Sequence, residues 1–151
     1  MKNSIQNYFT VLLFCLGTSQ LMAQESSDKN LIYAILDNQI EAWNSGDIDF
    51  FMEGYWKSDQ LVFVGSKGPT YGFVNTLNNY KISYPDLDAM GTLSFDILHF
   101  NQWDSQTIQL IGRFTLMRKS DQPTGFFTLL FRKINGEWVI VSDHSSAANL
   151  P

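Results

Sequence analysis

The residues best suited to chemistry lie near the end of the chain, where an aspartate and a histidine are neighbours. Asp143 and His144 stand in the run WVIVSDHSS, which starts at Trp138 and has the composition of a β-strand. Because an imidazole group titrates near neutral pH, His144 is a candidate general acid or base and a candidate ligand contact. A regular strand alternates its side chains, which places His144 on the face of Trp138 and Asp143 on the opposite face. A structural role for His144 at a strand end is the alternative.

A second group of residues could hold a ligand. Arg113 stands in the middle of a predicted strand, where a guanidinium needs either an acidic partner or an anionic ligand group. Aromatic residues make up 15% of the chain, and we expect some of these rings to line a cavity. The candidate ligand contacts among them are Trp43, Tyr55, Trp56 and Tyr80. Taken singly, each of these rings could equally be a core residue.

Several other kinds of site are disfavoured. His99 and His144 are the only histidines, and Cys15 is the only cysteine, so the sequence predicts no metal site. The loop Gly65–Gly68 lacks the spacing of a phosphate-binding loop, and no serine stands in a nucleophile elbow. We therefore expect no cofactor. A net charge of −5 without basic blocks makes nucleic acid a poor candidate partner.

The first 23 residues have the features of a secretory signal peptide. Lys2 supplies the positive charge, Tyr8–Leu16 the short apolar segment, and Ala23 a small residue for cleavage. A cut after Ser19 is the alternative. The apolar segment is shorter than the roughly 20 residues that a membrane span needs. We therefore expect a cleaved signal peptide and an exported protein, periplasmic or secreted, without a membrane span.

The remaining chain, residues 24–151, has a length typical of a single domain with a sizeable core. Its first half has the apolar periodicity of helices at residues 28–44, 47–55 and 73–84. A short strand is predicted at residues 60–64, followed by a turn-rich connection.

The second half is predicted to be sheet, with long strands at residues 92–103, 107–119, 125–134 and 137–145. The dipeptide Asn135-Gly136 joins the last two strands and is typical of a tight hairpin turn. Helices followed by an antiparallel meander indicate an α+β domain with the helices on one face of the sheet. Strand 125–134 carries apolar side chains on both faces, so we expect the open face to be covered by a second copy of the chain.

Three stretches carry a resemblance to a known family. These are EAWNSGDIDFFMEGYW from Glu41, YPDLDAMGTLSF from Tyr84 and GFFTLLFRKINGEWVIVSDHSS from Gly125. They resemble the SnoaL-like group of small bacterial proteins within the nuclear transport factor 2-like superfamily. The closing WVIVSDHSS is also similar to the end of the calcium/calmodulin-dependent kinase II association domain.

The resemblance covers essentially all of residues 24–151 and implies a cone in which three N-terminal helices pack on a curved, mostly antiparallel sheet. This fold hosts isomerases, cyclases, dehydratases, binding proteins and dimerisation modules, so it implies no single activity. Ketosteroid isomerase uses an aspartate base and a protonated aspartate in its oxyanion hole. The matching regions here, near Phe63-Val64 and Leu129-Leu130, are apolar, so that mechanism does not transfer.

Three functions follow as hypotheses. The leading one is an exported domain that binds a small apolar or aromatic molecule in an aromatic-lined pocket, with His144 and Arg113 as polar contacts. The second is an acid/base enzyme, of isomerase, cyclase or dehydratase type, that acts on an apolar cyclic substrate with His144 as the base. The third is a homodimerisation module without catalysis.

Overall fold

The computed structural model describes residues 27–148. The predicted signal peptide, residues 1–23, lies outside the described residues, so export stays a prediction. Within residues 27–148, no helix is both long and apolar enough to cross a bilayer.

The first element is a helix at residues 27–45, close to the predicted 28–44. Inside it the chain divides into two compact units, the first ending at Tyr33 and the second starting at Ala34. The described part of the first unit is helical throughout. The second unit holds the rest of the helix and the whole sheet.

Within the second unit, the helical residues bury one stripe of side chains at a spacing of three to four. This stripe consists of Leu36, Gln39, Ala42 and Trp43. The end of the helix is tied to the sheet, because the Asn44 side-chain nitrogen donates to the Leu93 carbonyl (3.2 Å) while its oxygen accepts from the Leu93 amide (2.7 Å).

Three shorter helices follow. Helix α2 (Ile48–Phe51) begins at Asp47, whose carboxylate accepts from the Phe50 amide at 2.9 Å, and it continues into a 3₁₀ turn at Met52–Gly54. Helix α3 spans Phe73–Ser83. These two match the predicted helices. Helix α4 (Leu87–Met90) was not predicted; it starts at Asp86 after the Pro85 break.

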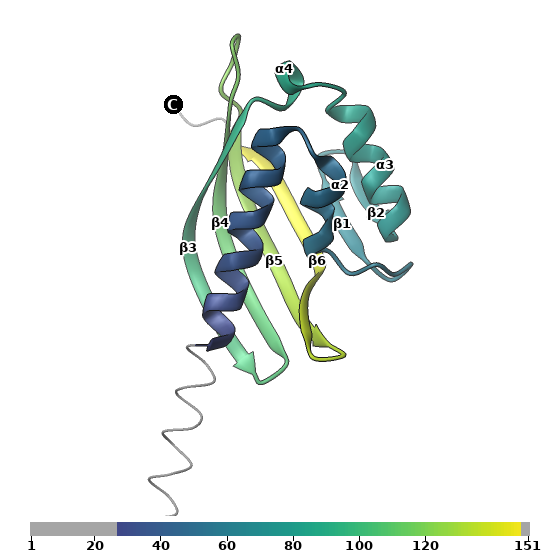
Figure 1. Ribbon diagram of the computed structural model, residues 1–151, viewed down its shortest axis with the longest axis vertical. Coiled ribbons are helices and arrows are strands. Elements are labelled where there is room, and N and C mark those ends of the chain that lie inside the picture. The colour runs from purple at the N-terminus through teal and green to yellow at the C-terminus, as the bar shows by residue number, and fades with distance from the viewer. Residues whose placement is uncertain (1–26, 149–151) are drawn as a thin grey trace, which may run out of the picture. The chain divides into compact units, whose positions relative to one another are not determined.

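The strands form one six-stranded sheet in the order β2-β1-β6-β5-β4-β3. Their bounds are β1 Val62–Gly65, β2 Gly68–Tyr71, β3 Thr92–Asp104, β4 Thr107–Met117, β5 Thr124–Ile134 and β6 Glu137–Ala148. Strands β1 and β6 pair in parallel and all other neighbours pair antiparallel. Figure 1 shows the helical residues from 34 onward, α2 and α3 on one side of this sheet.

The side facing the helices, here called the inner face, contains the core. Strand β5 alternates cleanly: Gly125, Phe127, Leu129 and Phe131 are buried, while the intervening side chains are partly or fully exposed. The α+β fold, its four long strands and the antiparallel meander are therefore confirmed. Strand β2 was not predicted. It lies within residues 65–72, which were predicted to be a turn-rich connection, and it pairs with β1.

Candidate functional site

A cavity of about 440 Å³ lies between the inner face of the sheet and the helices, all within the second unit. Its size is in the range of small-molecule sites. Strands β3 to β6 contribute one wall, and the helical residues 34–45, α2 and α3 contribute the other. The mouth is formed by the β1–β2 turn, the end of α3 and the segment that follows β4.

One wall of the cavity is a cluster of packed rings. Trp43 meets Tyr84 at a centroid distance of 4.7 Å, and Phe51 meets Tyr80 at 5.3 Å, both at steep angles. Phe63 adds a further edge contact to Tyr80 at 5.5 Å. Edge-to-face pairs of this kind hold the rings in fixed orientations.

The opposite wall uses two cross-strand pairs of phenylalanine and glycine. Phe114 on β4 is the partner of Gly125 on β5, and Gly112 is the partner of Phe127. A Cβ atom at either glycine would overlap the ring of its partner. The missing side chains therefore let both rings fold over the neighbouring strand, and both rings line the cavity.

Within the described part of the chain, one carboxyl group lines the cavity. Asp143 on β6 is only 3% exposed, its Oδ2 accepts a hydrogen bond from the Tyr55 hydroxyl at 2.8 Å, and its Oδ1 accepts one from the Ser145 hydroxyl at 2.9 Å. Tyr80 lies near this pair and interacts electrostatically with both Asp143 and Tyr55.

Burial raises the pKa of Asp143 to about 6, since the hydrogen bonds from Tyr55 and Ser145 and the nearby His144 offset the lost hydration only in part. Burial, followed by the charge of Asp143, raises the pKa of both Tyr55 and Tyr80 well above the usual value. The two phenols therefore remain protonated donors at neutral pH, while the carboxyl group can exist in either form.

The placement of His144 differs from the prediction. His144 is exposed and does not line the cavity, whereas Asp143 does. The cause is an irregularity in β6: Phe131 pairs with Ile140 and Leu130 pairs with Ser142, so Val141 is an extra residue. Such a bulge shifts the alternation by one, which turns Asp143 inward and His144 outward. The prediction of His144 as a cavity base is wrong.

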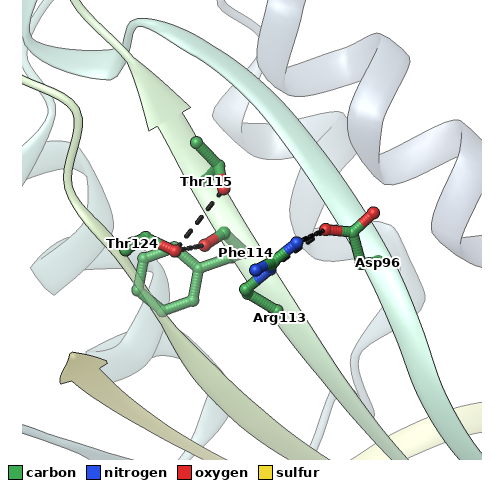
Figure 2. Close-up of polar contacts among 5 residues, drawn as sticks. All are labelled: Asp96, Arg113, Phe114, Thr115 and Thr124. Carbon is green, nitrogen blue, oxygen red and sulfur yellow. Dashed lines mark hydrogen bonds and ion pairs between the residues drawn. The ribbon is translucent and has the colours of Figure 1, made fainter. Parts of the chain in front are cut away.

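Arg113 also lies outside the cavity, on the outer face of the sheet. Its guanidinium donates to the Asp96 carboxylate from Nη2 (2.6 Å) and Nε (3.0 Å), across the pair of strands β3 and β4. Figure 2 shows this pair beside the Thr124 hydroxyl, which donates to the Phe114 carbonyl at 2.7 Å. The acidic partner that a mid-strand arginine needs is thus its direct cross-strand neighbour, and the prediction that Arg113 faces the ligand is wrong.

Of the four aromatic residues predicted to contact a ligand, three line the cavity and one does not. Trp43, Tyr55 and Tyr80 line the cavity as expected. Trp56 does not, because it lies beyond the 3₁₀ turn, where its backbone amide donates to the Ile140 carbonyl at 2.9 Å.

Comparisons with known proteins place this fold and cavity in a family. The chain matches the SnoaL-like domain over residues 32–149. It belongs to that family. A search of the curated proteins gives no match.

Similar solved structures agree with this assignment. An NTF-2-like protein of unknown function from Shewanella oneidensis MR-1 is 41% identical, with a TM-score of 0.76, over 79% of this chain and 98% of that one. A ketosteroid isomerase-like protein from Erwinia carotovora atroseptica is 16% identical (TM-score 0.65; 80% and 96% covered). A putative calcium/calmodulin-dependent protein kinase type II association domain from Thiobacillus denitrificans is also 16% identical (TM-score 0.67; 78% and 94% covered). The last two show a shared fold alone.

In this SnoaL-like domain, Asp143 lies between the two regions that match the catalytic aspartates of ketosteroid isomerase. Asp143 pairs with Phe63 on one side and with Leu129 on the other. Both flanking positions are apolar, and the central strand supplies the carboxyl group instead. The arrangement can hydrogen-bond a polar atom of a bound molecule, and it can exchange a proton near pH 6.

Sequence reasoning missed Asp143, Ser145 and Gln39 as cavity residues of this SnoaL-like domain. Gln39 interrupts an apolar helical stripe, and its side-chain nitrogen donates to the Phe51 carbonyl at 3.1 Å, which is a role that sequence does not reveal. For Asp143 the available signal was the run of polar residues from Ser142 to Ser146, which breaks the strict alternation of the strand.

Proposed function

We propose that this SnoaL-like domain binds a small, mainly apolar molecule in the cavity, and that Asp143 and Tyr55 form its polar contact. The observation that carries the proposal is a buried carboxyl group in a wall of rings and aliphatic side chains. No lysine or arginine among the described residues forms an ion pair with Asp143. A buried carboxyl group held only by neutral hydroxyls is typical of a ligand site.

The test compares two substitutions at neighbouring positions of β5. Leu129 faces the cavity and is 4% exposed, while Leu130 faces outward. Purified protein is screened against a library of apolar and aromatic compounds by native mass spectrometry, and hits are confirmed by thermal shift. We expect Leu129→Trp to fill the cavity and abolish binding, and Leu130→Trp to leave it unchanged.

Two results would contradict this proposal. One is the absence of any compound that binds the wild-type domain. The other is equal loss of binding in both tryptophan variants, which would place the compounds outside the cavity.

A second function is supported by the pKa of Asp143. A buried carboxyl group that titrates at about 6 is suited to move a proton to or from a bound substrate near neutral pH. We therefore propose proton transfer with Asp143, not His144, as the acid or base. Asp143→Asn should retain the binding of a substrate and stop its turnover; a substrate that is turned over at the wild-type rate by this variant would exclude the role.

We also propose that the outer face of the sheet forms a homodimer. Phe126 is 39% exposed there, with Ile111, Leu130, Val139 and Val141 only partly buried beside it on the same sheet. The fold shared with the Thiobacillus denitrificans association domain supports this proposal. Light scattering at micromolar concentration should give twice the mass of the chain, and Phe126→Arg should give the single mass. A wild-type protein that stays monomeric would exclude it.

A further inference from the structure

Among residues 27–148, three acidic or basic residues line the cavity: Asp143, Lys67 and Arg118. Asp143 lies deep, on the central strand β6, and is neutral below about pH 6. Above about pH 6 Asp143 is ionised, so two cations face one carboxylate and the charged lining residues sum to about +1, although the whole chain has a net charge of −5. A cavity with the opposite sign to the rest of the surface attracts anions selectively.

Both cations lie at the mouth. Lys67 is in the turn between β1 and β2. Strand β1 runs parallel to β6, and Val64 near the end of β1 lies opposite His144. The turn that follows β1 therefore lies beyond the level of Ser145. Arg118 directly follows β4. The last paired residues of β4 lie opposite the start of β5. The start of β5 in turn pairs with Ala147 and Ala148 at the end of β6. Lys67 and Arg118 therefore lie toward the same end of β6, and Asp143 lies further in.

Arg118 differs from the other paired cations of the described chain. Lys57, Lys81, Arg113 and Lys119 each contact a carboxylate at 2.6–2.8 Å. Arg118 approaches Asp121 only at 3.7 Å, through Nη1, and its Nε is buried without a hydrogen-bond partner. The guanidinium is thus incompletely paired within the described chain and is 25% exposed, which leaves it available to an anionic ligand group.

A purely structural role for Arg118 accounts for less. The turn after β4 is already closed by its backbone, because the Arg118 amide donates to the Asp121 carbonyl at 3.0 Å. The side chain adds the long contact to Asp121 through Nη1 and an electrostatic interaction with Tyr84. Because Nε is buried, a carboxylate in the cavity would be bound by the terminal nitrogens of the guanidinium, which can donate two parallel hydrogen bonds.

We propose that Arg118, assisted by Lys67, binds the carboxylate of an amphipathic carboxylic acid whose apolar body fills the cavity and whose far end reaches Asp143 and Tyr55. This inference rests on the proposed ligand-binding function and specifies its ligand class. Lys67 is exposed at the rim and contributes a long-range attraction. Arg118 is the positioning contact, since its side chain is 25% exposed and partly dehydrated.

The test uses pairs of compounds that differ only in charge. The probes are 2-naphthylacetic acid and 2-naphthylacetamide, cinnamic acid and cinnamamide, and decanoic acid and decanamide, with affinities measured by calorimetry at pH 7.5. We expect at least one acid to bind at least about tenfold more tightly than its amide, as for a charge-assisted bidentate contact. Arg118→Met should remove this preference while leaving the affinity for the amide unchanged, and Lys67→Met should reduce it about threefold.

Arg113→Met is the matched control, because Arg113 precedes Arg118 by five residues and lies outside the cavity. It should leave the preference intact. If Arg118→Met does not fold, the wild-type protein alone tests the anion site. Raising the salt concentration from about 0.05 M to about 0.5 M should weaken the binding of the acid and leave the binding of the amide unchanged.

The outcomes separate this inference from the function on which it rests. Equal affinity for acids and amides, with both lost in Leu129→Trp, would overturn the anion site and keep the ligand-binding cavity. A preference for acids that Arg118→Met does not change would overturn the assignment to Arg118. Absence of binding by all six compounds would overturn the inference, and the wider library screen then decides the proposed function alone.

Discussion

The two faces of the sheet carry acidic side chains in contrasting environments. On the outer face, Asp96 forms an ion pair with Arg113 in which the two side chains are 58% and 43% exposed. On the inner face, Asp143 is 3% exposed and its partners are the neutral hydroxyls of Tyr55 and Ser145. A solvated pair of this kind contributes about 0–1 kcal/mol to stability. A buried carboxyl group without a cation instead has a raised pKa and is held in place by the surrounding core.

The comparison separates two roles for polar residues on one sheet. Asp96 and Arg113 are cross-strand neighbours on β3 and β4 that pair while both remain partly exposed. Asp143 costs stability when it is ionised, and the proposed ligand or proton transfer would give this buried carboxyl group a use. The predictions that follow test this separation.

The largest expected effect compares two phenylalanines of β5 that face opposite sides. Phe131 is fully buried and Phe126 is 39% exposed. Phe131→Ala should lower the free energy of unfolding by about 3–5 kcal/mol, because it leaves a cavity in the core. Phe126→Ala should cost below about 1 kcal/mol at low protein concentration, with a larger cost at high concentration if the outer face is a dimer interface.

Denaturant unfolding followed by tryptophan fluorescence measures both changes over a range of protein concentrations. A cost for Phe126→Ala that equals the cost for Phe131→Ala at every concentration would mean that the outer face is covered by the chain itself.

The next effect concerns pH. The folded-state pKa of Asp143, about 6, is above the ordinary value of 3.8 for an aspartate, so the folded state binds the proton more tightly than the unfolded state. This contribution to stability is fully present below about pH 3.8 and is lost as the pH rises through about 6. The shift of about two pKa units corresponds to about 3 kcal/mol.

Asp143→Asn mimics the protonated carboxyl group and should remove this loss, so the variant should be more stable than the wild type at pH 8 and similar to it at pH 4. Asp96→Asn is the control on the outer face and should change stability by about 1 kcal/mol or less at either pH. Unfolding curves at several pH values provide the measurement; a wild type that gains stability between pH 4 and pH 7 relative to Asp143→Asn would contradict the assignment.

The same contrast explains what the sequence could predict. Apolar periodicity predicted the helices at residues 28–44, 47–55 and 73–84, and the Asn135-Gly136 dipeptide predicted the turn between the last two strands. Both signals are local, so they can be read from the sequence alone. The high aromatic content predicted Trp43, Tyr55, Trp56 and Tyr80 as cavity rings, and all of these except Trp56 line the cavity. Strand β2 was missed because the segment Gly68–Tyr71 is short and carries turn residues.

The chemistry of the site was not predictable in the same way, because it depends on one extra residue in β6. The bulge at Val141 reverses the facing of every later side chain in the strand, so strict alternation assigns His144 to the cavity in place of Asp143. Arg113 could not be placed without the register of β3 and β4, which brings Asp96 directly opposite. Both facts concern pairing between strands, which no local pattern contains.

A smaller effect is expected at the outer ion pair. Arg113→Met and Asp96→Asn should each reduce stability by about 1 kcal/mol or less, and the double-mutant coupling should be about 0.2–1 kcal/mol and should shrink as salt is added. Denaturant unfolding of the wild type, both single variants and the double variant gives this coupling. A value of several kcal/mol would show that the pair is buried in the assembled protein, as in a dimer interface.

The smallest effect is expected for His144, and it tests the bulge directly. His144 is exposed on the outer face, so His144→Ala should change the free energy of unfolding by no more than about 0.5 kcal/mol and should leave ligand affinity unchanged. Its positive charge nonetheless favours the ionised form of Asp143, so its removal should move the pKa of Asp143 slightly above about 6. Carboxyl NMR titration of Asp143 in the wild type and the variant measures this shift. A loss of binding as large as that of Leu129→Trp would mean that His144 faces the cavity and that β6 is regular.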